Sequence, residues 1–155
     1  MKFARTLIAS VAAGLLATSA IAMTKEEHKT AKDNIEATYK ADKNNCDALT
    51  ANAKDICQKE AKGKEKVAKA ELEAQYKPSA KNTQKVAEAR ADAAYDVAKE
   101  KCDDLKGNEK DVCEKDANAE KNEANYKAAK ERCDALSGDA KSKCVDDMKR
   151  MYNKS

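Results

Sequence analysis

The chain of 155 residues has no tryptophan, one phenylalanine, one proline and four glycines. With so few large apolar side chains, it is poorly suited to enclose the dry pocket that most enzymes use. The scarcity of proline and glycine leaves long stretches of alanine, lysine and glutamate, which are strong helix formers. The composition therefore predicts an all-α protein with a thin core in which alanine supplies most of the apolar surface.

Sequence motifs of enzymes and metal sites are also missing. The chain has no Gly-rich phosphate loop, no HExxH and no GxSxG, and its carboxylates are interspersed with lysines. The one histidine, His28, has no second His and no Cys or Asp at ligand spacing, so we expect a solvated surface residue. The sequence thus predicts a protein that is not an enzyme, with no catalytic residue, no cofactor and no metal.

What the chain does have is a twelve-residue unit that occurs three times and contains all six cysteines. The copies read CDALTANAKDIC (46–57), CDDLKGNEKDVC (102–113) and CDALSGDAKSKC (133–144). In each copy Asp follows the first Cys, Leu stands three positions after it, and a second Cys stands eleven positions after it. In one straight helix the two cysteines would lie about 16 Å apart, whereas a disulfide needs Cα atoms within about 4.4–6.8 Å.

A helix–turn–helix brings the two cysteines of each copy together, so the spacing predicts three disulfides within helical hairpins: Cys46–Cys57, Cys102–Cys113 and Cys133–Cys144. Gly107 and Gly138 suit the left-handed position just past a helix end. Asn52, Asn108 and Asp139 are expected to cap the following helix. Pairing between chains or thiol binding of a metal are the alternatives, but metal sites usually have shorter Cys spacings or added histidines.

Residues 1–22 are typical of a signal peptide, because Lys2 and Arg5 precede a short apolar run and 20–22 reads Ala-Ile-Ala. The alternative is an uncleaved anchor, but the run is short for a bilayer span. We therefore expect no stable membrane span after cleavage, a periplasmic or secreted location, and oxidised cysteines. Loss of Lys2 and Arg5 lowers the formal net charge from +3 to +1, which argues against nucleic-acid binding.

Pro78, the only proline, divides the remainder into two segments. We expect a first helical hairpin over 23–77 and a three-helix segment over 78–155 that is packed on the first or hinged to it. The fold class predicted from these observations is all-α, with disulfide-stapled helical hairpins forming an up-down helical bundle of about five helices.

Large side chains are rare enough to be considered individually. Met148, Met151 and Tyr152 form an apolar cluster near the end of the chain, which is either a candidate protein interface or a cap on the core. Three tyrosines, at 39, 95 and 126, each stand seven positions before a cysteine. We expect their rings to pack on alanines and their hydroxyls to reach the surface.

The stretches AKDICQKEAKGKEKVAKAELEAQYKPS (53–79) and AYDVAKEKCDDLKGNEKDVC (94–113) resemble secreted Ala/Lys-rich helical proteins of Gram-negative bacteria that are often labelled TolA-like cell-envelope proteins. The resemblance is largely one of composition and implies an envelope location, without a role for any single residue. The sequence therefore predicts a non-catalytic periplasmic or secreted protein, structural or protein-binding, with a cell-envelope partner. The alternative is a periplasmic stress or chaperone-like binding protein.

Overall fold

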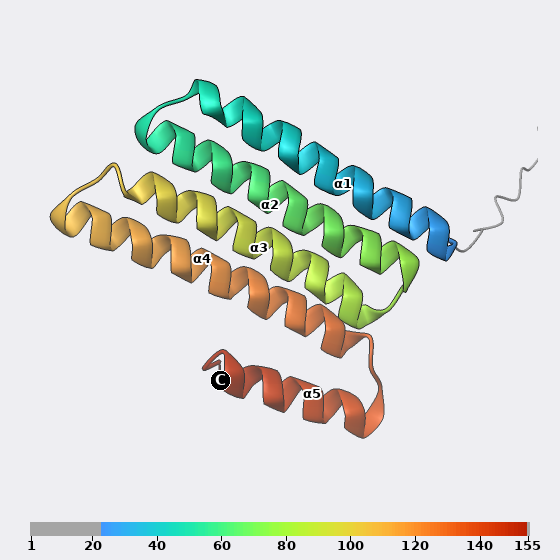
Figure 1. The fold of residues 1–155 in the computed structure, drawn as a ribbon. Coiled ribbons are helices and arrows are strands. Elements are labelled where there is room, and N and C mark those ends of the chain that lie inside the picture. Colours follow the sequence, from blue (N-terminus) through green and yellow to red (C-terminus); the bar gives the residue numbers. More distant parts are fainter. Residues whose placement is uncertain (1–22, 155) are drawn as a thin grey trace, which may run out of the picture.

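The computed structural model describes residues 23–154 and contains five α-helices that alternate in direction (Figure 1). They are α1 (Lys25–Asn45), α2 (Ala51–Tyr76), α3 (Ala80–Cys102), α4 (Gly107–Asp134) and α5 (Gly138–Met151), with a short 3-10 helix, η1 (Cys46–Ala48), after α1. No strand occurs between residues 23 and 154. The prediction of an all-α, disulfide-stapled up-down bundle is confirmed, whereas the predicted signal peptide, 1–22, lies outside the described residues.

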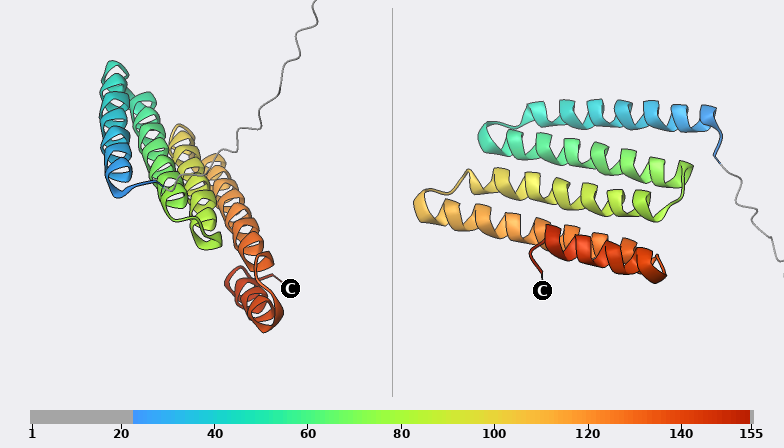
Figure 2. Two further views of the ribbon diagram at one scale, coloured as in Figure 1. Left: turned by 90° about the vertical axis from the view of Figure 1, so that its right-hand side faces the viewer. Right: turned by 90° about the horizontal axis from the view of Figure 1, so that it is seen from below.

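The bundle is open rather than closed. Helices α1 to α4 lie side by side in one layer, and the shorter α5 packs along α4 (Figures 1 and 2). Within the described residues, each α-helix contacts only the α-helices before and after it in the chain, and η1 contacts α1 and α2. Helices α2 and α3 therefore have partners at their sides, but no other described helix lies across their two faces.

The segments before and after Pro78 pack together through α2 and α3. After the proline, the hydroxyl of Ser79 accepts a hydrogen bond from the Asn82 N–H and caps α3. Antiparallel α2 and α3 are then joined by ion pairs, Lys66 to Asp92 at 2.6 Å and Arg90 to Glu71 at 2.7 Å. The structure thus places 23–77 and 78–154 against each other along the length of these two helices.

The core is thin, and small side chains supply most of it. The buried apolar residues are Cys46, Ala61, Leu72, Ala89, Ala91, Cys102, Ala117, Ala128, Ala129, Cys133, Cys144 and Met148. Among them only Leu72 and Met148 are large, and burial of an alanine methyl contributes far less free energy than burial of a leucine. Four of the six cysteines are in this set, so the disulfides serve both as cross-links and as core.

Gly63 lies at a close approach of α2 to α3. The helix continues through it, and the residue is buried. A Cβ built on Gly63 would lie only 2.8 Å from the Cβ of Ala93 and 3.5 Å from its Cα. Because Ala93 has no flexible side chain that could move aside, a methyl group at position 63 must push the helices apart.

We expect Gly63→Ala to lower the free energy of unfolding by about 1–2 kcal/mol in urea denaturation. Overpacking costs about 1–3 kcal/mol, and the better helix propensity of alanine returns at most about 1 kcal/mol. The matched control is the double variant Gly63→Ala/Ala93→Gly, which moves the methyl to the other helix and should recover most of the loss. A single variant as stable as the wild type would show that the close approach does not limit packing.

Candidate functional site

The three predicted disulfides are confirmed, and each closes one helical hairpin. The Cα atoms are 5.6 Å apart in Cys46–Cys57, 5.7 Å in Cys102–Cys113 and 5.5 Å in Cys133–Cys144. The first cysteine of each pair is fully buried, and no free cysteine remains among the described residues. The cysteines thus form structural cross-links.

The leucine of each repeat closes the turn. Its N–H donates to the carbonyl of the first cysteine, at 3.0 Å for Leu49, 3.0 Å for Leu105 and 3.1 Å for Leu136. This i to i+3 bond makes a tight 3-10 turn at the end of the first helix. The leucines are 37–42% exposed, so their repetition reflects a common turn rather than a common core position.

The capping predicted for these turns was wrong in one respect. Gly107 and Gly138 do adopt left-handed φ values of 56° and 57°, but they begin the second helix of their hairpins instead of following the first. The N-cap positions are Thr50, Lys106 and Ser137. The residues predicted as N-caps, Asn52, Asn108 and Asp139, each lie two positions after the observed N-cap, inside the helix. The next helix starts earlier in the chain than predicted, because the tight turn closed by the leucine begins at the first cysteine.

Asn52 has a different role. Its side-chain Nδ2 donates to the backbone carbonyl of Glu100 at 3.0 Å. This bond connects the start of α2 to the last turn of α3, and therefore joins the two stapled turns that lie at the same end of the layer (Figure 1).

An ion pair across each turn was not predicted from the sequence. The Asp after the first cysteine binds a Lys seven positions later: Asp47–Lys54 at 2.9 Å, Asp103–Lys110 at 2.7 Å and Asp134–Lys141 at 3.0 Å. The hydrogen bond from the lysine lowers the pKa of Asp103 and of Asp134. Lysine stands at the same place in all three copies, so aligning the copies would have revealed it. The complete unit is Cys-Asp-x-Leu, four residues, Lys, two residues, Cys.

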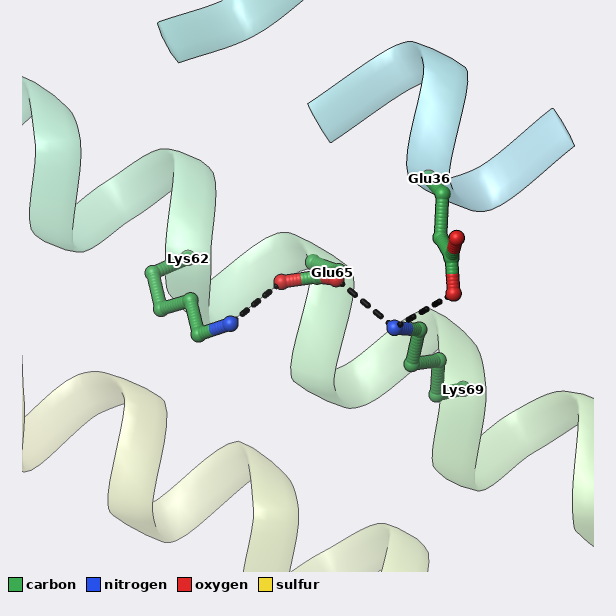
Figure 3. A network of polar contacts seen from close by, with 4 residues as sticks. All are labelled: Glu36, Lys62, Glu65 and Lys69. Atoms are coloured by element: carbon green, nitrogen blue, oxygen red, sulfur yellow. Dashed lines mark hydrogen bonds and ion pairs between the residues drawn. The ribbon is translucent and has the colours of Figure 1, made fainter. Parts of the chain in front are cut away.

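Glu65 is the one buried charged residue among those described, at 7% exposure. Its carboxylate accepts hydrogen bonds from Lys62 at 2.7 Å and Lys69 at 2.8 Å, and Lys69 also reaches Glu36 of α1 at 3.2 Å (Figure 3). The bonds from Lys62 and Lys69 lower the pKa of Glu65. A general acid or base at neutral pH needs a carboxyl pKa raised towards 7. This network therefore connects α1 and α2 and is unsuited to proton transfer.

Asp92 connects three helices. It lies on α3 and binds Lys66 of α2 at 2.6 Å and Lys121 of α4 at 2.8 Å. Burial raises the pKa of Asp92, but the hydrogen bonds from Lys121 and Lys66 outweigh it and leave the pKa below its usual value. Ionised Asp92 thus stabilises the folded protein.

This shift predicts a pH dependence of stability. Because the pKa of Asp92 is lower in the folded chain than the value of about 3.9 in the unfolded one, its stabilisation is present above about pH 4 and is lost as the pH falls further. Urea denaturation between pH 5 and 3 should show a smaller decline for Asp92→Asn than for the wild type. Exposed Asp104, changed to Asn, is the control and should leave the wild-type slope unchanged. Equal slopes for wild type and Asp92→Asn would contradict the assignment.

Each repeated tyrosine has a lysine ammonium over its ring. The distances from Nζ to the ring centroid are 5.0 Å for Lys62 over Tyr39, 4.9 Å for Lys121 over Tyr95 and 5.2 Å for Lys154 over Tyr126. The rings are partly buried, and in each case the lysine comes from a later part of the chain. Through these cation–π contacts Tyr39 helps to join α1 to α2, and Tyr95 helps to join α3 to α4. Tyr126 holds the segment that follows α5 against α4.

The prediction that His28 is a solvated surface residue was wrong. Its side chain is 17% exposed, and its Nε2 lies 2.8 Å from a carboxylate oxygen of Glu73. The imidazole also stacks on the ring of Tyr76, with centroids 4.3 Å apart. His28 thus attaches the first turn of α1 to the end of α2, opposite the end that Cys46–Cys57 closes.

The three residues of the candidate interface near the end of the chain, Met148, Met151 and Tyr152, have different environments in the structure. Met148 is 2% exposed and belongs to a cluster with Ala129, Cys133 and Cys144. Tyr152 packs against that cluster and makes a T-shaped contact with the Tyr126 ring, with centroids 5.9 Å apart. Met151 is 64% exposed. Met148 and Tyr152 therefore serve the core, and Met151 is the residue of the three that remains accessible.

An open groove of about 650 Å³ runs between α2 and α3 on one face of the layer. Its apolar lining consists of Gly63, Val67, Ala68, Ala93, Ala94, Val97 and Ala98. Its charged rim consists of Glu60, Lys64, Glu71, Arg90 and Lys101. The valines rise from a lining of glycine and alanine, so the groove offers a shallow apolar surface between two charged edges.

Residues 23–154 contain neither a candidate metal site nor a candidate membrane span. No group of three or more His, Cys, Asp and Glu in this part of the chain is arranged to hold a metal ion. No helix in it is long and apolar enough to cross a membrane. Comparison of the chain with protein-family models, with curated proteins and with solved structures gave no match.

Proposed function

We propose that this chain is a non-catalytic periplasmic or secreted protein of the cell envelope that acts by structure or by binding another protein. The observation that carries the proposal is the stapled hairpin, which the chain builds three times with the same disulfide, the same turn bond and the same ion pair. Structural disulfides of this kind are typical of oxidising compartments outside the cytosol.

The electrostatics of the layer support a role that does not involve catalysis. The buried Glu65 and the partly buried Asp92 are each held by two lysines, and each has a pKa below its usual value. A lowered pKa means that the neighbouring lysines stabilise the ionised carboxylate, as expected for a structural ion pair. The resemblance to TolA-like envelope proteins and the signal-peptide pattern of 1–22 agree with this proposal.

A cross-linking pull-down from the periplasm tests it. The full-length chain is expressed so that it is exported, and we expect one cell-envelope protein to be recovered at a stoichiometric yield. Because Met151 is exposed, Met151→Gln should reduce that yield without lowering the melting temperature if the chain end takes part. Retention of the chain in the cytosol, or turnover of a substrate by the purified protein, would contradict the proposal.

The groove between α2 and α3 favours a second candidate, a periplasmic stress or chaperone-like binding protein. Such proteins bind apolar segments of unfolded clients, and an apolar groove suits an amphipathic helix. The test is suppression of aggregation of a reduced, unfolded client by the oxidised protein. Ala94→Arg, which fills the groove from an exposed position, should abolish that suppression, and an unaffected variant would exclude the groove as the client site.

A further inference from the structure

We propose that the groove between α2 and α3 is covered by the same groove of a second copy of this chain, in a two-fold dimer. The inference does not depend on the proposed envelope role, and a dimer of this kind would leave no room in the groove for the client of the second candidate function. It starts from the open layer, because no described helix lies across α2 and α3 on this face. It is carried by the distribution of charge along the two rims of the groove.

The two rims have opposite charge at both ends. On the α2 rim the end residues are Glu60 and Glu71, and on the α3 rim they are Lys101 and Arg90. The helices are antiparallel, and Glu71 and Arg90 form an ion pair at 2.7 Å, so these two residues share one end of the groove and Glu60 and Lys101 share the other. Lys64, between the ends on α2, lies 3.9 Å from Asp42 of α1, so part of its charge is offset within the chain.

This pattern selects one way for two copies to face each other. A two-fold axis along the groove places α2 of one copy over α3 of the other at the same height. Glu60 then opposes Lys101 of the second copy, and Glu71 opposes its Arg90, each twice in the dimer. A two-fold axis across the groove would instead place Glu60 opposite Glu71 and Lys101 opposite Arg90. Complementary potentials favour and orient association, so the axis along the groove is the favoured one.

The apolar lining fits the same arrangement. Gly63 of α2 and Ala93 of α3 lie at the same height, because a Cβ on Gly63 would lie 2.8 Å from the Cβ of Ala93. Val67 and Val97 stand one helical turn from this point, in opposite directions along the groove, because the helices are antiparallel. In the dimer, therefore, no valine of α2 lies opposite a valine of α3, and the small residues at the centre allow the two copies to approach closely. The dimer would give the layer the second apolar layer that a single chain lacks.

Sedimentation velocity of the oxidised protein, over a wide range of concentration, tests the proposal. We expect a reversible dimer. Both Glu60 and Lys101 are exposed, so charge reversal at either position should leave the chain folded. Glu60→Lys and Lys101→Glu should each raise the dimer dissociation constant about tenfold, because two opposed ion pairs become repulsive. The double variant Glu60→Lys/Lys101→Glu should restore the wild-type value. Glu131→Lys, at an exposed position of α4, is the matched control and should have no effect.

Ala94→Arg places a long side chain in the groove from an exposed position, and we expect it to give a monomer with an unchanged melting temperature. A wild-type protein that stays monomeric at every concentration would overturn the proposal. So would a dimer that Ala94→Arg leaves intact, because it would use another surface. A dimer that Ala94→Arg breaks but that the charge swap does not restore would overturn the proposed two-fold axis.

Discussion

Replacing Cys133 and Cys144 together with alanine should release α5 from α4 while the other four helices stay folded. Closing a loop of this size stabilises a chain by about 3 kcal/mol in the chain-entropy model. Helix α5 has 14 residues, a length at which an isolated helix is marginal in water, and within the described chain it contacts α4 alone. Loss of the disulfide therefore removes most of what holds α5 in place.

Hydrogen exchange measures this release directly. Amides of α5 should exchange about a hundredfold faster in the variant, which corresponds to a loss of about 3 kcal/mol in local opening free energy. The matched variant removes Cys102 and Cys113. It loses a loop of the same length, but α3 and α4 also share a long interface that includes the Asp92–Lys121 pair. We expect these two helices to remain packed. Unchanged protection of α5 in the first variant would contradict the account.

Met148→Gln should have the second largest effect. The side chain is 2% exposed and lies against Cys133, Cys144 and Ala129. Gln has nearly the same length and volume as Met, so no cavity forms, and the cost is that of burying an amide oxygen and an amide NH2 without partners, about 1–3 kcal/mol for each polar group. The loss cannot exceed the free energy that docks α5, so we expect about 2–4 kcal/mol, seen as faster hydrogen exchange confined to α5 and the facing part of α4.

Met151→Gln is the matched control, because it is the same substitution three positions later at a side chain that is 64% exposed. We expect its melting temperature and exchange rates to stay at the wild-type values. If the two variants lost equal stability, Met151 would also be part of the core and the division between the two methionines would be wrong.

The stapled hairpins could be predicted because a geometric limit decides them. Two cysteines eleven positions apart cannot meet in a straight helix, and Gly107 and Gly138 favour a turn between them. Ala51 takes the same left-handed conformation in the first copy, with a φ of 50°. The start of the next helix was harder to place, because Asn52, Asn108 and Asp139 are good capping residues by type. The tight turn closed by the leucine N–H determines where the next helix starts. This is a hydrogen bond between backbone groups, so side-chain preferences do not predict it.

Contacts between distant residues were the part that the sequence did not reveal. His28 meets Glu73 across 45 positions, and no local pattern connects them. The lysines at 54, 110 and 141 are hidden by the abundance of lysine, although they recur at one place in the repeat. Met148 and Met151 share a helix face by spacing, but α5 packs on one helix only, so the contact is too narrow to bury both.

The arrangement of the helices in an open layer could not be predicted from the sequence either. A stripe of alanines packs closely against a neighbouring helix both in an open layer and in a closed bundle. The buried alanines of α3 and α4 therefore do not distinguish these two arrangements. The ion pairs of Asp92 with Lys66 and Lys121 fix α3 between α2 and α4. These pairs form only when three helices lie in one particular register, and no local sequence pattern predicts that register.

This protein consists of hairpins closed by one repeated unit, and peptide mapping without reduction tests that structure most directly. Lysines separate every cysteine from the next in the sequence, so trypsin places each cysteine on its own peptide. We predict three cross-linked pairs in the protein purified after export: Cys46–Cys57, Cys102–Cys113 and Cys133–Cys144. A dominant Cys113–Cys133 cross-link, or cysteines that remain free thiols, would contradict the account.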